Sequence, residues 1–183
     1  MMNYTIYKKK YLTQYDDTKL NFMTDVNDYV TGKVVKDTKL GFFLLKFVNL
    51  PLIGSSVRNS MINGTKKYAP KTIDMEEASK LIQNSRKCAL GERVCRVLHR
   101  ESELTQSVFL DELADGMVQA GKAKYAPKDK AINTLKIYSK KHIMIISTVD
   151  KKPMEICCSS RETCIYWNME RNGLRCVNCT QSG

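Results

Sequence analysis

The clearest strand signal in the chain is the run His142-Ile143-Met144-Ile145-Ile146-Ser147-Thr148-Val149. It is short, almost continuously apolar and rich in isoleucine, which is typical of a buried β-strand. The polar Asp150-Lys151-Lys152-Pro153 follows and favours a turn. The turn leads into Met154–Cys158, which ends in two adjacent cysteines. We therefore expect a cysteine-bearing segment to follow a buried strand.

Helical patterns flank this strand. Asp74, with Glu77 three residues later, forms a capping pattern, and it opens a helix that ends near Asn84. Further helices are predicted over residues 105–121, from 127 onward, and over 161–172. Together with the buried strand, these segments predict an α+β fold: a small helix-rich domain with a short sheet, in which the cysteine-bearing segments converge on one site.

Three regions follow from the pattern along the chain. Residues 1–38 alternate weakly between apolar and polar, so we expect a strand-rich N-terminal segment. Residues 39–172 form a core domain that contains cysteines, and residues 173–183 form a tail with two more. The most apolar stretch, Leu40–Gly54, is predicted to be a core helix broken by Pro51, with a membrane-surface anchor as the alternative.

Composition limits the class of protein. The chain has 183 residues, is 43% hydrophobic and carries a net charge of +11, which is typical of a basic globular protein. No apolar run reaches the roughly 18 residues that a membrane-spanning helix needs, and the first residues lack the apolar core of a signal peptide. We therefore expect a cytoplasmic protein. Seven cysteines against two histidines then favour a metal site made of thiolates over a disulfide framework.

The cysteines fall into two groups that are far apart in sequence. They are spaced as Cys88-x6-Cys95 and Cys157-Cys158-x5-Cys164-x11-Cys176-x2-Cys179. A [4Fe–4S] cluster takes four thiolates from segments that can be distant in sequence, whereas zinc is most often held by closely spaced hooks. Basic residues surround the first group, where they would offset thiolate charge: Arg86, Lys87, Arg93 and Arg96.

Three stretches also resemble a known class of protein. They are Leu50-Pro51-Leu52-Ile53-Gly54, the Glu76-Glu77-Ala78 helix of residues 73–82, and Cys88-Ala89-Leu90-Gly91-Glu92-Arg93-Val94-Cys95-Arg96. Together with the helical segment from Val108 and the later Ile156-Cys157-Cys158, they resemble ferredoxin-like [4Fe–4S] proteins of anaerobic microbes and archaea, over about residues 45–165. The resemblance implies a [4Fe–4S] cluster shared between the two cysteine groups. The first pair departs from the pattern, with six residues between its cysteines where those proteins have one.

The sequence therefore predicts an iron–sulfur protein with a role in electron transport or as a redox accessory. The predicted cluster ligands are Cys88, Cys95, Cys158 (or Cys157) and Cys164. The basic surface would dock an acidic redox partner protein.

Two alternatives stay open. The first is a zinc module held by Cys158, Cys164, Cys176 and Cys179, whose basic C-terminal third, net +7 over residues 121–183, contacts nucleic acid. Nucleic acid is the less favoured partner because the aromatic residues form no stacking platform. The second is a cluster-dependent enzyme with one open iron site, so the sequence alone does not decide whether the chain is an enzyme.

Overall fold

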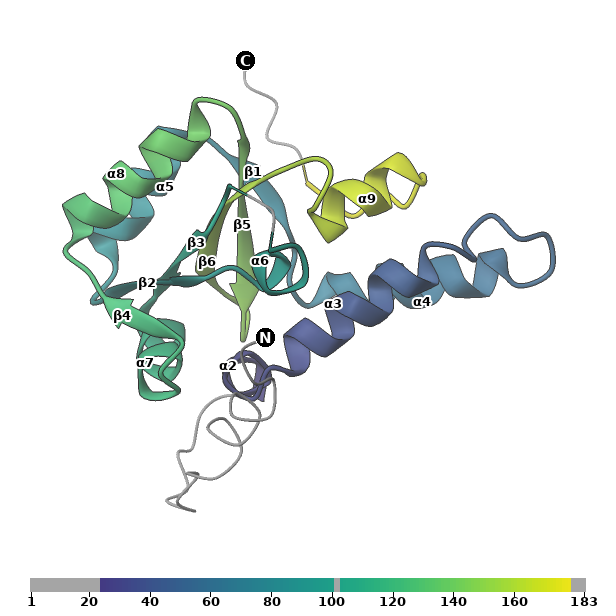
Figure 1. Cartoon of the computed structure of the whole chain (residues 1–183), viewed down its shortest axis with the longest axis horizontal. Coiled ribbons are helices and arrows are strands. Elements are labelled where there is room, and N and C mark those ends of the chain that lie inside the picture. Colours follow the sequence, from purple (N-terminus) through teal and green to yellow (C-terminus); the bar gives the residue numbers. More distant parts are fainter. Residues whose placement is uncertain (1–23, 101–102, 179–183) are drawn as a thin grey trace, which may run out of the picture.

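The computed structural model of the chain describes residues 24–100 and 103–178 (Figure 1). Its centre is an antiparallel sheet in the order β1-β5-β6-β3-β2-β4, which confirms the predicted α+β class. The strands are β1 (Lys71–Ile73), β2 (Cys88–Glu92), β3 (Gln106–Leu110), β4 (Ala123–Tyr125), β5 (Ile143–Val149) and β6 (Lys152–Ser159).

The isoleucine-rich run and the segment that follows it form the β5–β6 hairpin near the middle of the sheet. Ile145 pairs with Cys157, and Ile146 pairs with Ile156. Asp150 and Lys151 have φ values of 49° and 65°, which give the turn the twist that a tight hairpin requires. The Asp150 carboxylate also accepts the N–H groups of Asp25 and Val26 at 3.2 and 3.0 Å, so the turn anchors the first described helix.

One face of the sheet is closed by two helices, α5 (Met75–Asn84) and α8 (Lys128–Ser139) (Figure 1). The predicted cap of α5 is confirmed, since the Asp74 side chain accepts the Glu77 N–H at 2.7 Å. The core between helices and sheet is apolar and contains Ile82, Leu135, Ile156, Cys88 and Cys158. This face therefore has the character of an ordinary hydrophobic core.

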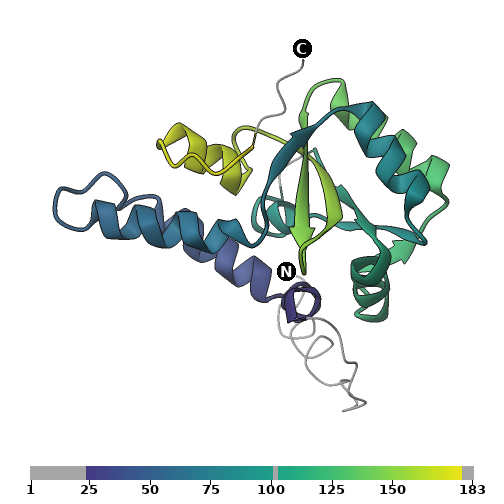
Figure 2. The same ribbon diagram turned by 180° about the vertical axis from the view of Figure 1, so that it is seen from behind.

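The other face is covered by α2 (Thr24–Val30) and α7 (Asp111–Gln119), and the short α6 (Val94–Leu98) follows β2. A long helical hairpin of α3 (Lys33–Leu44) and α4 (Gly54–Lys66) extends away from the sheet, with α9 (Ile165–Arg171) beside it (Figures 1 and 2). Buried Val48, Met61 and Met169 join the hairpin to α9. None of the described helices is long and apolar enough to cross a membrane.

Three predictions of secondary structure are wrong. The stretch Leu40–Gly54, predicted as a core helix broken by Pro51, is instead the end of α3 at Leu44 and a turn over residues 45–53 that leads into α4, and Leu52 in that turn is exposed. Residues 24–38 of the predicted strand-rich segment lie in α2 and α3, and the rest of that segment is outside the described residues. Gln106–Leu110, predicted as the start of a helix, is the central strand β3. Its Val108, Phe109 and Leu110 are buried on alternating faces, so the run is apolar throughout and shows neither helical nor strand periodicity.

Gly91 in β2 provides a test of the packing of the sheet. A Cβ there would lie 2.7 Å from atoms of Phe109, Ala123 and Lys122, so we expect Gly91→Ala to lower the free energy of unfolding by about 1–3 kcal/mol. Gly64, in α4, has open space around its Cα, and Gly64→Ala should raise the same quantity by about 0.5–1 kcal/mol. Urea unfolding of both variants measures the difference, and equal effects would contradict the packing described.

Candidate functional site

A buried guanidinium marks the most unusual polar site of the described structure. Arg93 comes directly after β2 as the residue before α6, and only 2% of it is exposed. Its Nη1 donates to the Leu104 carbonyl oxygen at 3.2 Å. A buried charge is costly unless it is compensated. Burial opposes the charge of Arg93, but electrostatic interactions with Cys157, Cys95, Cys164 and Glu155 raise its pKa.

Two of these sulfurs form a hydrogen-bonded pair. Cys95 lies in α6, and Cys164 is the residue before α9. The Cys164 thiol donates to the Cys95 sulfur, which also accepts the backbone N–H of Ile165. Two segments 69 residues apart in the chain (164 minus 95) therefore meet at one pair of sulfur atoms.

The hydrogen bonds and the guanidinium together favour a thiolate at Cys95. The hydrogen bond from Cys164 lowers the pKa of Cys95 most, burial opposes it, and the charge of Arg93 lowers it further, giving a pKa of about 7. The pKa of Cys164 is raised well above its ordinary value because its proton is held by Cys95 and because it is buried. Cys95 is thus the sulfur that ionises, and Cys164 keeps its proton.

The third sulfur belongs to Cys157 in β6. Burial is the main cause that raises the pKa of its thiol, and the attraction of Arg93 does not offset it. Side chains two residues apart in a strand share a face, so Cys157 points the same way as Glu155. Glu155 accepts hydrogen bonds from Tyr29 Oη at 2.6 Å and Ser107 Oγ at 3.1 Å, and its burial raises the pKa of its carboxyl group.

The structure separates the predicted cluster ligands into two groups. Cys95, Cys157 and Cys164 are the cysteines that raise the pKa of Arg93, whereas Cys88 and Cys158 lie in the hydrophobic core on the other face of the sheet, from which Cys158 still feels the charge of Arg93. The Cys88 thiol donates to the Ala126 carbonyl at 3.1 Å, and the Cys158 thiol to the Leu135 carbonyl at 3.7 Å. The set Cys88, Cys95, Cys158 and Cys164 is therefore not brought together, because adjacent strand residues point to opposite faces.

The zinc set is not brought together either, as far as it is described. Cys158 and Cys164 are on opposite sides of the sheet, and the Cys176 thiol donates to the Tyr166 carbonyl at 3.8 Å. Cys179 lies outside the described residues. Within residues 24–100 and 103–178, no group of three or more His, Cys, Asp or Glu side chains is arranged to hold a metal ion.

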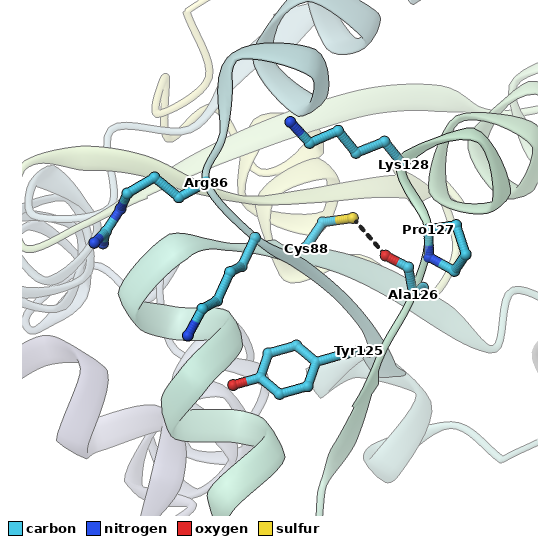
Figure 3. A pocket seen from close by; sticks show the side chains of 7 residues that line it. Arg86, Cys88, Tyr125, Ala126, Pro127 and Lys128 are labelled. Atoms are coloured by element: carbon cyan, nitrogen blue, oxygen red, sulfur yellow. Dashed lines mark hydrogen bonds between the residues drawn. The ribbon is translucent and has the colours of Figure 1, made fainter.

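Cys88 also lines a pocket of about 370 Å³ at the edge of the sheet (Figure 3). Arg86, Lys87 and Lys128 surround it, but each is already engaged: with Glu112, with Asp115 and with the Gln83 carbonyl. Burial is the main cause that raises the pKa of the Cys88 thiol. Cys88 is thus a protonated structural residue. The three basic side chains that line the pocket already bind other groups of the protein.

Two components of the site were not predicted from the sequence. Glu155 and Tyr29 are bonded to each other, yet they lie 126 residues apart and Tyr29 falls in a helix that was not expected. A signal for Glu155 existed: it is a charged residue inside an apolar strand and two positions before Cys157. Arg93 was expected to offset thiolate charge, and its position in the structure agrees with that role.

The reactivity of Cys95 tests the electrostatics of the site. Its rate of alkylation by iodoacetamide should rise with pH and reach half its maximum near pH 7, because only the thiolate reacts. Arg93→Met should move this midpoint upward, and Arg93→Lys, which keeps the charge, should move it less. The exposed Arg100 provides the control, since Arg100→Gln should leave the midpoint unchanged. Peptide mass spectrometry measures the rate at Cys95, and a wild-type midpoint near the ordinary value of 9 would contradict the assignment.

The chain was compared with protein-family models, with curated proteins and with solved structures, and none of the three comparisons found a match. The resemblance to ferredoxin-like iron–sulfur proteins therefore stays a prediction. Function is inferred below from the contacts of this chain alone.

Proposed function

We propose that the chain is a thiol-based redox protein in which Cys95 is the attacking thiolate and Cys164 is its resolving partner. The observation that carries the proposal is the hydrogen bond from the Cys164 thiol to the Cys95 sulfur beside the buried Arg93. A disulfide between these two cysteines would bring their sulfurs to about 2.05 Å. A redox role agrees with the function expected from the sequence, with thiols in place of a cluster.

The oxidant that suits this site is a small hydroperoxide, because Cys95 is only partly exposed. The Cys95 thiolate attacks one peroxide oxygen: an S–O bond forms, the O–O bond breaks, and the departing oxygen takes a proton to leave as water or an alcohol. The Cys164 sulfur then loses its proton and attacks the Cys95 sulfur, and the hydroxyl group leaves with that proton as water. Two thiols give up two electrons, and the peroxide takes both.

Each neighbour supports one part of this chemistry. Arg93 keeps Cys95 ionised near neutral pH, and the Ile165 N–H holds the thiolate in place. Cys164 and Cys157 keep their protons, because a second thiolate would repel the first and burial opposes it. The site therefore holds one nucleophile and one adjacent thiol that can resolve its oxidised form.

The iron–sulfur cluster stays a prediction, and cysteine variants distinguish it from the dithiol. A cluster held by Cys88, Cys95, Cys158 and Cys164 would depend on all four thiols, whereas the dithiol needs only Cys95 and Cys164. Cys88→Ala and Cys158→Ala thus give opposite expectations under the two hypotheses. Iron and sulfide analysis of anaerobically purified protein, together with its visible absorption, shows whether a cluster is present.

Oxidation of the reduced protein by hydrogen peroxide tests the proposal. We expect the loss of two thiols, recovery of both with dithiothreitol, and a disulfide between the peptides that contain Cys95 and Cys164. Oxidation should accelerate as pH rises through about 7, because the Cys95 thiolate is the reactive form. Thiol counting and peptide mass spectrometry measure both outcomes.

The matched controls are single alanine variants of the other buried cysteines. Cys88→Ala and Cys158→Ala should form the same disulfide at the wild-type rate, while Cys164→Ala should stop at sulfenic acid on Cys95. Cys95→Ala should abolish the reaction. Equal peroxide sensitivity of all four variants, or a disulfide that uses Cys88 or Cys158, would refute the dithiol assignment.

A further inference from the structure

The tip of the α3–α4 hairpin exposes an unusual amount of apolar surface. Leu50, Leu52 and Ile53 are exposed in the turn at the tip, and Leu40 and Phe43 are exposed along α3. They account for five of the nine large apolar residues that are exposed in the described chain. Leu52, at the turn between the helices, is 93% exposed. An apolar cluster of this kind on a surface marks an interaction site.

Hydrogen bonds within the turn between α3 and α4 hold the tip in one conformation. The Arg58 side chain donates to the Val48 carbonyl at 2.9 Å and to Asn49 Oδ1 at 2.5 Å, which fixes the start of the turn. Gly54 closes the turn by donating to the Leu50 carbonyl at 2.9 Å, and a Cβ on Gly54 would lie 2.6 Å from the Val48 oxygen. Val48 is 1% exposed and holds the tip against the core of the hairpin. Leu52 is therefore held outward by an ordered turn.

Lysines lie beside the apolar side chains. Lys36, Lys39 and Lys46 are exposed and take part in no ion pair among the described residues. Because residues three and four apart share a helix face, Lys36 and Lys39 line the same side of α3 as Leu40 and Phe43. Residues 33–66 contain six basic residues and one acidic residue, a net charge of +5.

We propose that the hairpin tip docks the protein on the surface of an anionic lipid bilayer. The tip projects away from the sheet, so it can enter a bilayer surface without obstruction by the rest of the molecule (Figures 1 and 2). Leu50, Leu52 and Ile53 would enter the boundary between headgroups and acyl chains, and Lys46 in the turn would contact anionic headgroups. Lys39 and Lys36, which lie farther back along α3, would add a weaker attraction that falls off with distance from the surface. The proposal does not depend on the thiol chemistry, since it uses none of the cysteines.

Vesicle flotation with the full-length protein tests this proposal. The wild-type chain should float with vesicles of phosphatidylcholine and phosphatidylserine, and much less with phosphatidylcholine alone. Lys36, Lys39 and Lys46 changed together to Gln should weaken binding about tenfold, because Lys46 near the surface contributes about fivefold and the more distant Lys36 and Lys39 contribute less. The matched control changes Lys130, Lys136 and Lys140, three exposed lysines at or beside α8, to Gln and should retain wild-type binding.

A second pair of variants tests the apolar contribution. Leu52→Asp should abolish flotation, whereas Ile137→Asp, at a residue that is 65% exposed on α8, should not. Both residues are on the surface, so the thermal unfolding of both variants should match the wild type. Absence of wild-type flotation, or equal losses in the α3–α4 and α8 variants, would overturn the proposal. A dimer that Leu52→Asp converts to a monomer without any vesicle binding would instead assign the tip to a second copy of the chain.

Discussion

The compensation of one buried positive charge organises the candidate site. Arg93 has little access to water, and a hydrogen bond to the Leu104 carbonyl does not neutralise a guanidinium. The negative partners available nearby are the Glu155 carboxylate and a cysteine thiolate. Burial raises the pKa of the Glu155 carboxyl group, while hydrogen bonds from Tyr29 and Ser107 and the charge of Arg93 lower it. The electrostatics that keep Arg93 charged inside the protein therefore also prepare Cys95 as a nucleophile.

The fold makes this environment possible by separating the two faces of the sheet. Cys157 and Cys158 are neighbours in the sequence, yet one points toward Arg93 and the other into the apolar core beneath α8. The segments that carry Cys95 and Cys164 are supported from outside by α3, where the ring of Phe42 lies 5.1 Å from that of His99 and Gly41 faces Ile165. The projecting hairpin thus supports the thiol site at its base and presents apolar side chains at its tip.

The sequence was informative where local signals were strong. The isoleucine-rich strand, the turn at Asp150, the capped α5 and the glycine after α9 all appear in the structure at or near their predicted positions. β3 was missed because a strand buried on both faces has no periodicity. The convergence of two cysteine groups was predicted in outline, and the alternation of side chains in β6 decides which cysteines meet. Which of Cys157 and Cys158 faces Cys95 could not be predicted before the register of β6 was known. The Glu155–Tyr29 contact could not be predicted because it joins residues that only the tertiary structure brings together.

The most direct test of this account is an ultraviolet titration that counts thiolates as a function of pH. Comparing wild type with Cys95→Ala isolates the ionisation of one sulfur. We expect the difference between the two proteins to be a single thiolate with a midpoint near pH 7. A difference that appears only near the ordinary cysteine value of 9, or no difference between the two proteins, would show that Arg93 does not activate Cys95 and would contradict the central claim.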